Sequence, residues 1–390
     1  MQQNEFDSAI RQLETPFYLF DTDAACARVR ALKAAFPHTQ ICYAMKANPF
    51  LVGALAGTAD CFEVCSPGEF QICERAGLNM HQVVLSGVYK KPEDVDRVVR
   101  TYRGANLFTA ESPAQWTLLA RTAEKHGVPI RVMLRVTVGN QFGMDEAEVC
   151  RIIAERAAHP LVTLEGLQLF TATQRKNPQR MCKELQQLDA LIQSLKTAYG
   201  YETPRLEYGP GLPVRYFDDE PDFEPAVWQA LRDALDALSY HGPVVLELGR
   251  AVAATCGNYV TSVVDVKTNH GTNYCMVDGG IHQLNYFGQM MAMKRPPVTH
   301  IGSGGETADW TVCGALCTIN DVLLKAYPMA RPHVGDRLVF GRAGAYSVTE
   351  GTALFLSREL PQIFLYSEKD GLRRVRGHFQ TNALNSAEPK

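Results

Sequence analysis

The sequence predicts an α/β protein in which an N-terminal (β/α)8 barrel is followed by a C-terminal all-β domain. Eight apolar, strand-like runs alternate with helix-like stretches over about 240 residues, the number of units that such a barrel contains. A doubly wound sheet is the alternative, but it does not usually need eight sequential units. After about residue 258 the helical patterns stop, and short β-branched and aromatic runs separated by Gly, Pro, Asp and Asn indicate a domain of short strands.

The elements follow in order along the chain. Residues 16–21 form a short apolar and aromatic run typical of a strand, and residues 24–36 have a helical pattern. Most of the barrel strand candidates are continuously apolar, as expected of parallel strands that are covered by helices. These candidates are residues 41–47, 60–66, 82–87, 105–110, 130–136, 165–170, 205–209 and 244–249. We expect a barrel domain at 23–258 and a β domain formed by 1–22 and 259–390.

Composition argues against several classes of function. The net charge is −3, from 39 basic and 42 acidic residues spread along the chain, so we expect no nucleic-acid partner. We find no apolar run near the roughly 20 residues that span a bilayer, and the polar N-terminus lacks the apolar core of a secretory signal. Eleven cysteines without a CxxC pair favour mostly buried thiols over disulfides or a metal site. We therefore expect a cytoplasmic protein without a membrane partner.

Residues 43–48, Tyr-Ala-Met-Lys-Ala-Asn, end the first barrel strand. Side chains at the C-terminal ends of barrel strands point into the active site. Apolar neighbours there would favour the neutral amine of Lys46, which Schiff-base formation with an aldehyde requires. The alternative is a surface lysine just past a strand.

Two further segments lie at the ends of later strands. Glu247 precedes Gly249-Arg250, and a carboxylate at this place can face the ring nitrogen of pyridoxal phosphate (PLP), keeping it protonated. Gly209 and Gly211 follow the seventh strand, where barrels often bind phosphate through backbone N–H groups. An ordinary Glu–Arg pair and a structural turn are the respective alternatives.

The β domain holds two more candidates. Cys317 could reach a reacting centre as a proton donor, and Tyr346 could reach a phosphate. Each side chain taken alone is as well explained by packing.

Together and in this order, YAMKAN, EVCSPGE, ELGR, VDGG, CGALCTINDVL and AGAY resemble the fold-type III PLP-dependent decarboxylases, the group of diaminopimelate, ornithine and arginine decarboxylases. The resemblance covers nearly the whole chain. It implies an alanine racemase/ornithine decarboxylase-like fold, PLP as the cofactor, and a homodimer with shared active sites. It also implies that the run at 16–21 joins the β domain.

The resemblance also implies roles for individual residues. Lys46 matches the Schiff-base lysine, Glu247 the pyridine partner, and Cys317 a catalytic cysteine donated across the dimer interface. Glu69 stands at the start of the helix that follows the EVCSPGE strand. Thr318 and Tyr346 are the implied substrate contacts. The implied cofactor contacts are Lys46, Glu63, Arg135, Gln168, Thr171, Gly209, Gly211, Glu247, Arg250 and Tyr346.

Two departures from the family pattern bear on function. Gln168 stands where the family usually has a histidine that stacks on the PLP ring, while Thr171 keeps a hydroxyl for the phosphate. Thr318 stands where the family usually has an Asp or Glu that binds a distal ammonium of the substrate. Losing such a buried pair removes on the order of 2–5 kcal/mol, which argues against lysine-, ornithine- or diaminopimelate-type substrates.

Residues 141–146 and 171–174 are similar to a subgroup of secondary metabolism that acts on aminoacyl groups linked to a carrier protein or on siderophore precursors. We therefore expect a non-standard amino-acid substrate, presented by a carrier protein in one version of this hypothesis. The alternatives are a diaminopimelate decarboxylase of lysine biosynthesis, a PLP-dependent racemase and a non-catalytic PLP-binding protein. The acidic Glu247 argues against a racemase, since racemases of this fold pair the ring nitrogen with arginine.

Overall fold

The computed structural model describes residues 3–287 and 292–387 and divides into two compact units. The barrel unit consists of Cys26–Val214 and Asp222–Ala251. The β unit consists of the described parts of Met1–Ala25, Arg215–Pro221 and Val252–Lys390. The short segment Arg215–Pro221 groups with the β unit, which no feature of the sequence had suggested.

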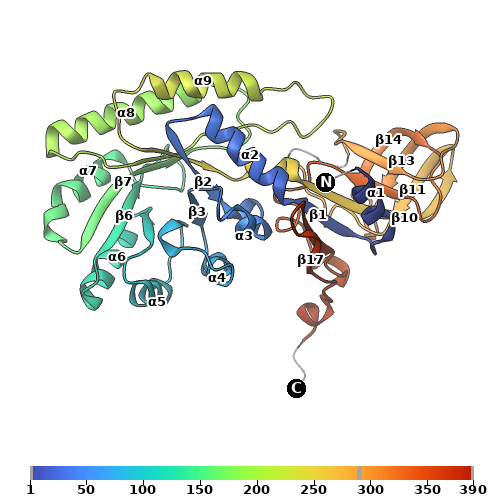
Figure 1. The fold of residues 1–390 in the computed structure, drawn as a ribbon, viewed down its shortest axis with the longest axis horizontal. Helices are drawn as coiled ribbons and strands as arrows, with labels where there is room; N and C mark the ends of the chain where they lie inside the picture. Colours follow the sequence, from blue (N-terminus) through green and yellow to red (C-terminus); the bar gives the residue numbers. More distant parts are fainter. Residues whose placement is uncertain (1–2, 288–291, 388–390) are drawn as a thin grey trace. The chain divides into compact units, whose positions relative to one another are not determined.

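All eight predicted barrel strands form, and they close into a parallel barrel in chain order (Figure 1). The continuous apolar runs become strands because both of their faces are covered, by the barrel interior and by the surrounding helices. The predicted fold class is therefore confirmed. The strands are β2 (Thr39–Ala44), β3 (Cys61–Val64), β4 (Val83–Leu85), β5 (Leu107–Ala110), β6 (Ile130–Arg135), β7 (Val162–Phe170), β8 (Leu206–Gly209) and β9 (Val244–Leu248).

Helices separate the barrel strands and pack around them (Figure 1). Two begin with the same local signal: Ser66 and Ser112 cap α4 and α6 through their hydroxyls, and each is followed by a proline at the first helical position. The helices are α2 (Thr22–Ala35), α3 (Val52–Leu55), α4 (Pro67–Arg75), α5 (Pro92–Tyr102), α6 (Pro113–His126), α7 (Glu146–Glu155), α8 (Gln179–Tyr199), α9 (Glu224–Asp236) and α10 (Arg250–Ala253).

Strand β7 carries an irregularity that matters for the site. Its register against β6 shifts between Val132 and Met133, so that Leu164 and Gly166 face consecutive residues of β6. Gly166 has φ 139°, and a Cβ there would lie 1.8 Å from the carbonyl oxygen of Arg205. The bulge therefore needs glycine for its backbone conformation and for its close approach to the chain next to β8.

The β unit contains one nine-stranded sheet in the order β14-β13-β11-β10-β1-β16-β17, with β15 paired to β10 and β12. Strand β1 (Phe17–Asp21) pairs antiparallel with β10 and parallel with β16, so the run at 16–21 lies in this sheet. Helix α1 (Gln3–Gln12) places Ile10 against Phe17, Leu19 and Val260. The other strands are β10 (Gly257–Asn269), β11 (Thr272–Val277), β12 (Val298–Ile301), β13 (Thr307–Cys313), β14 (Val322–Ala330), β15 (Arg337–Phe340), β16 (Gln362–Ser367) and β17 (Gly371–Arg376).

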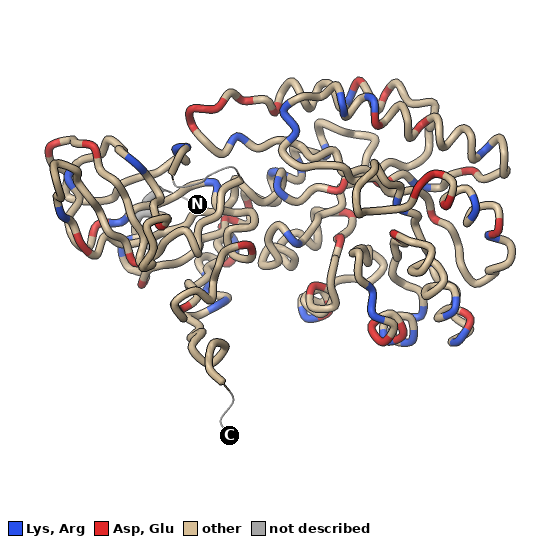
Figure 2. Tube along the Cα trace, turned by 180° about the vertical axis from the view of Figure 1, so that it is seen from behind, with Lys and Arg blue, Asp and Glu red and all other residues tan. Residues whose placement is uncertain are grey.

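The structure shows how the charged residues, the apolar helices and the thiols are distributed. Acidic and basic residues are interspersed along the helices around the barrel (Figure 2). Within residues 3–287 and 292–387, no helix is long and apolar enough to cross a membrane. All eleven cysteines lie in this described part of the chain and are free thiols, and Cys317 is the exposed one. Parts of the expected β domain, residues 1–2, 288–291 and 388–390, lie outside the described residues.

Replacing Gly166 with alanine is expected to destabilise the barrel. The added Cβ would collide with backbone rather than with a movable side chain, and the positive φ is unfavourable for alanine, so we expect a loss of about 3 kcal/mol. Thermal unfolding followed by circular dichroism should show a midpoint lowered by several degrees. Gly57→Ala is the matched control, because a Cβ there meets nothing within 4 Å. An unchanged midpoint for Gly166→Ala would contradict this reading of the bulge.

Candidate active site

Polar side chains gather at the C-terminal ends of the barrel strands. Each strand supplies one, either from its last residues or from the residues directly after it, as expected of the functional end of a barrel. In strand order from β2 to β9 these side chains are Lys46, Glu63, Ser86, Glu111, Arg135, Gln168, Glu207 and Glu247.

The amine of Lys46 lies between two buried carboxylates. Its Nζ donates to Glu63 Oε2 at 2.6 Å and lies 3.4 Å from Glu247 Oε1. The ring of Phe170 lies 5.6 Å below the same nitrogen, and the thiol of Cys65 lies 3.9 Å away. Glu63 and Glu247 are both nearly fully buried. The structure thus brings together three of the residues that the sequence singled out.

This geometry corrects the expectation that Lys46 is kept neutral by its apolar surroundings. Burial does lower the pKa of Lys46, but attraction to Glu63 and Glu247 outweighs it, and the net pKa lies well above its ordinary value. In this structure the amine is an ammonium ion. The sequence argument failed because it weighed the apolar neighbours along the strand and not the acids from β3 and β9.

Glu63 and Glu247 differ in their protonation. Burial raises the pKa of Glu63, yet the ammonium of Lys46 at 2.6 Å holds it below its ordinary value. Burial and the negative charge of Glu63 raise the pKa of Glu247 to about 8, against a smaller opposing effect of Lys46. At neutral pH Glu63 is therefore the ionised partner of Lys46, and Glu247 holds a proton.

Gln168, on β7, contacts two buried acids. Its Nε2 donates to Glu207 Oε1 at 3.0 Å and to Glu247 Oε2 at 3.3 Å. Glu207 in turn accepts a hydrogen bond from Arg205 at 2.8 Å. The sequence analysis did not identify Glu207 or Arg205. The available signal was a glutamate two residues before Gly209 and two residues after Arg205. Residues two apart in an extended chain point to the same face.

Glu207 also lies near Cys42 and Cys61, and these three could supply ligands for a metal ion. Arg205 argues against one, because its guanidinium is 2.8 Å from Glu207 and 3.5 Å from the Cys61 sulfur. A cation that already balances the carboxylate removes the charge that would attract a metal. Burial also raises the pKa of the Cys42 thiol well above its ordinary value, which disfavours the thiolate that metals bind.

The loop after β3 is held by a capping box. Ser66 accepts a hydrogen bond from the Glu69 N–H, and the Glu69 carboxylate accepts one from the Cys65 N–H at 2.6 Å. Glu69 therefore fixes the backbone beside the Lys46 cluster and does not contact the amine itself. Gln115 plays the same part after β5, because its side chain accepts from the Glu111 N–H at 3.0 Å.

Arg135 is buried beside the cluster. Its Nη1 lies 3.0 Å from Glu111 Oε2, and its guanidinium stacks over Phe142 at 4.7 Å. Within the described residues its Nε is a buried donor without a hydrogen-bond partner. Lys90 is a second cation nearby: burial lowers its pKa to about 8, and its Nζ donates to the Gly87 carbonyl. The sequence analysis missed Lys90 and Glu111, which lie in loops without a distinctive motif.

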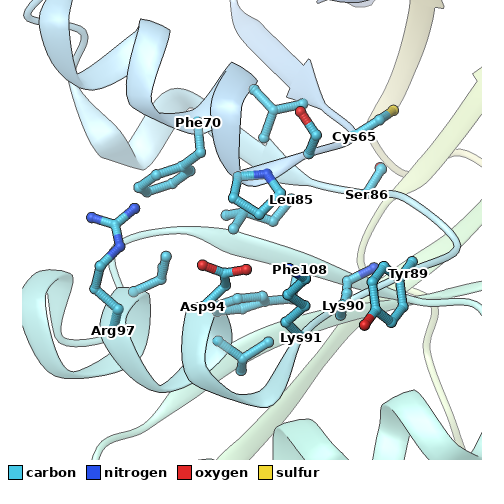
Figure 3. Close-up of a pocket in the computed structure, with 15 residues that line it drawn as sticks. Cys65, Phe70, Leu85, Ser86, Tyr89, Lys90, Lys91, Asp94, Arg97 and Phe108 are labelled. Carbon is cyan, nitrogen blue, oxygen red and sulfur yellow. The ribbon is translucent and has the colours of Figure 1, made fainter. Parts of the chain in front are cut away.

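A pocket extends from this end of the barrel between β4, α4 and α5 (Figure 3). Cys65 and Ser86 line it where β3 and β4 end, and Lys90 and Tyr89 line the loop that follows β4. Its other wall is apolar, with Phe70 from α4 and Phe108 from β5 among its residues. Cys65, in the lining of this pocket, donates to Glu63 at 3.3 Å, so one lining residue contacts the carboxylate that holds Lys46.

The loops after β7, β8 and β9 lie against one another. A Cβ at Gly211, where φ is 64°, would lie 2.2 Å from the Ala172 carbonyl oxygen, and one at Gly209 would lie 2.1 Å from the Phe170 ring. Arg250 Nε donates to Thr173 at 3.3 Å across the same loops. Only glycine permits this close packing of the loops.

Thr171 is not brought to the Lys46 cluster. Its hydroxyl donates to Glu184 on α8 at 2.9 Å, and Glu184 also pairs with Arg175 at 2.7 Å. Cys317, Thr318 and Tyr346 lie in the β unit. There the carboxylate of Asp321 accepts hydrogen bonds from the N–H groups of Ile281 and Leu316, which holds the loop of Cys317. The approach of these three residues to the barrel stays an expectation from the sequence.

Comparison with known proteins decides the family. Residues 23–254 match the model of the pyridoxal-binding domain of the pyridoxal-dependent decarboxylases. The chain belongs to the fold-type III PLP-dependent decarboxylases. Its cofactor is therefore PLP, and its chemistry is the decarboxylation of an amino acid.

Two relatives illustrate the range of substrates in this family. An L-glutamyl-[BtrI acyl-carrier protein] decarboxylase of Niallia circulans is 26% identical over 93% of this chain and 91% of its own length. A diaminopimelate decarboxylase of Helicobacter pylori is 23% identical over 87% of this chain and 88% of its own length.

Solved structures agree on the fold. The Helicobacter pylori diaminopimelate decarboxylase complexed with L-lysine has a TM-score of 0.82 at 22% identity and covers 97% of this chain and 98% of its own. A lysine/ornithine decarboxylase of Vibrio vulnificus complexed with putrescine has a TM-score of 0.81 at 22% identity, with 94% and 98% covered.

The barrel residues of this decarboxylase fit PLP. Lys46, just after β2, and Glu247, on the neighbouring strand β9, lie at the same end of the barrel, and they supply an amine for an aldehyde and a proton-bearing carboxyl for a ring nitrogen. Because these two groups of PLP lie at opposite ends of its ring, the Lys46 amine would have to move away from its present 3.4 Å contact with Glu247. Gly209, which ends β8, and Gly211 in the loop after it allow the close backbone approach that a phosphate needs. Gln168 Oε1 and Arg135 Nε are buried polar atoms without hydrogen-bond partners in the described residues, as expected where a polar ligand completes the site.

The raised pKa of Glu247 predicts a pH dependence of stability for the cofactor-free protein. A carboxyl whose pKa rises on folding stabilises the fold below its ordinary value near 4.5, and this contribution is lost as the pH rises through about 8. We expect the free energy of unfolding to fall between about pH 5 and pH 8, by on the order of 3 kcal/mol from this group. Urea titrations at several pH values measure it.

Glu247→Gln cannot titrate and should show a smaller fall over the same range. A residual slope is expected, because burial also raises the pKa values of Glu69 and Glu207. Glu63 acts outside this window, since its lowered pKa moves its contribution to more acidic solutions. Identical pH slopes for the variant and the wild-type protein would show that Glu247 is not the titrating group.

Proposed function

We propose that Lys46 is the residue that carries PLP and that Glu247 is the partner of the ring nitrogen. The observation that supports this assignment is the position of the Lys46 amine, 2.6 Å from Glu63 and 3.4 Å from Glu247 at the C-terminal end of the barrel. Lys90, the other lysine near the cluster, donates instead to Gly87 and Gln115, outside the Glu63–Glu247 pair.

Bound PLP supplies the electron sink for the pair of electrons released when the bond between Cα and the carboxylate breaks. Glu63 accepts a proton from the ammonium of Lys46, which frees the amine to react with an aldehyde. Glu247 holds a proton next to the ring nitrogen and can transfer it there, remaining as the anion that keeps that nitrogen charged. CO₂ leaves, and the proton that replaces it on Cα comes from Cys317 or from Lys46.

The backbone around Gly209 and Gly211, together with Arg250, is the proposed phosphate site. The two glycines let the backbone approach a phosphate closely, and Arg250 adds a positive charge on the neighbouring loop. Arg135, paired with Glu111, is the proposed cation beside the ring. Gln168 stands where the family usually has a histidine that stacks on the PLP ring, and its flat amide is the proposed contact with the ring.

The proposed substrate is an amino-acid derivative whose distal end bears no ammonium, in the first case an aminoacyl group linked to a carrier protein. Two observations support it: Thr318 stands where the family usually has an acid, and one relative acts on an L-glutamyl group carried by an acyl-carrier protein. Diaminopimelate is the second candidate, because several relatives decarboxylate it. With a carrier-linked substrate, the proposed role of this enzyme is in secondary metabolism. In the proposed homodimer, a shared active site would bring Cys317 to the barrel.

Borohydride reduction of the purified holoenzyme should fix the cofactor to Lys46. Proteolysis and mass spectrometry then locate the modified residue, and Lys46→Ala should abolish the covalent label. Lys90→Ala is the control, since it removes a nearby lysine that lies outside the proposed link. Label on any other lysine, or on none, would overturn the assignment.

Mass spectrometry of reaction mixtures should show loss of one CO₂ from an amino acid attached to a carrier protein, and slow or no turnover of free diaminopimelate, ornithine and lysine. A carboxylate placed after Cys317 restores the partner of a distal ammonium, so Thr318→Asp should raise turnover of these free diamino acids relative to wild type. Turnover of free diaminopimelate by the wild-type enzyme near the enzyme median of about 10 per second would contradict the carrier-linked proposal.

A further inference from the structure

Glu207 is an acid that no role proposed above requires. It is fully buried in the barrel, and both of its oxygens are engaged: Oε2 accepts from Arg205 at 2.8 Å and Oε1 accepts from Gln168 at 3.0 Å. A buried carboxylate is costly unless it is paired and hydrogen-bonded. Burial raises the pKa of Glu207, while the charge of Arg205 and the hydrogen bond from Gln168 oppose that rise and favour the ionised carboxylate.

The nitrogen of Gln168 is in contact with two acids at once. Besides Glu207, it lies 3.3 Å from Glu247 Oε2. The oxygen of the amide cannot take this place beside an ionised carboxylate, because two acceptors would face each other. Glu247 does not decide between the two ends of the amide: with a pKa of about 8 it holds a proton at neutral pH and can donate as well as accept.

Glu207 decides which end of the Gln168 amide faces the acids. Arg205 donates to Glu207 and favours its ionised form, which can only accept hydrogen bonds. The Gln168 nitrogen then faces Glu207, and the oxygen at the other end is left as a buried acceptor without a partner in the described residues. We infer that Glu207, held by Arg205, is a positioning residue that fixes the Gln168 amide so that its nitrogen faces the two acids and its oxygen faces the cofactor. This inference rests on the proposed function.

The same charge acts on Glu247. The charged groups that act on Glu247 are Glu63, Lys46, Glu207 and Arg135, and the thiols of Cys42 and Cys65 also interact with it. On the side of Glu207, the neighbours are Arg205, Glu63 and the thiols of Cys42 and Cys61. Removing the negative charge of Glu207 stabilises the ionised form of Glu247, so its titration should move to lower pH.

The test uses the holoenzyme with Glu207→Gln, which keeps the shape of the side chain. An amide at position 207 can donate or accept, so Gln168 loses its fixed orientation. We expect the dissociation constant of PLP to rise by about tenfold, as for the loss of one hydrogen bond to a charged group. The pH at which the absorbance of the bound cofactor changes should fall. A purely structural role would leave that pH unchanged.

Glu207→Gln leaves Arg205 buried without its anion, which can impair folding. The double variant Arg205→Gln/Glu207→Gln removes both charges and keeps the same expectation for PLP affinity. Glu74→Gln is the matched control, because Glu74 also pairs with an arginine at 2.8 Å but on the outer helix α4. It should change neither the affinity nor the pH of the absorbance change.

A second background separates positioning from a direct effect on affinity. In Gln168→Leu the amide is absent, so adding Glu207→Gln should have little further effect on the dissociation constant of PLP. If Glu207→Gln weakens binding equally with and without Gln168, or leaves both readouts unchanged, the inference is wrong. That result is distinct from a failure of the proposed function, which borohydride labelling at Lys46 tests by itself.

Discussion

The chemistry of the barrel depends on the balance of charge among the buried groups at the C-terminal ends of its strands. Three buried carboxyl groups, Glu63, Glu207 and Glu247, form ion-pair contacts with two cations, Lys46 and Arg205. Two of the acids can be ionised with their charges matched, and the third must hold a proton. The distances assign that proton to Glu247, because each of the other two has a cation within 2.8 Å. The site therefore stores one proton.

The main chain makes this arrangement stiff. Capping boxes at Ser66 and Ser112 return the chain from strand to helix with side chains that bond the backbone on both sides of the turn. Gly209 at the end of β8 and Gly211 just after it pack against the end of β7 and its following loop at a separation that no larger residue permits. Rigid loops on a closed sheet hold charged groups at defined distances, and these distances set the pKa values.

Much of the fold was predictable from the sequence, because continuous apolar runs of four to eight residues separated by helical periods have few other solutions. Lys46 and Glu247 were also predictable, since each directly follows or ends such a run. Glu207 and Arg205 were not: their importance comes from the pairing of β8 with β7, which places Glu207 opposite Gln168, and local sequence does not contain this register. The protonation of Lys46 was misjudged for the same reason, because its acids come from strands distant in the chain.

The bulge in β7 means that the number of residues between Val162 and Gln168 fixes the direction in which Gln168 points. Side chains alternate between the two faces of a strand, so one additional residue exchanges the faces of everything that follows. The extra residue near Gly166 thus decides that Gln168 enters the barrel and meets Glu207, while its neighbours face outward. A single deletion between Val162 and Gln168 would rotate the Gln168 amide out of the interior and leave Glu207 and Glu247 without their shared donor.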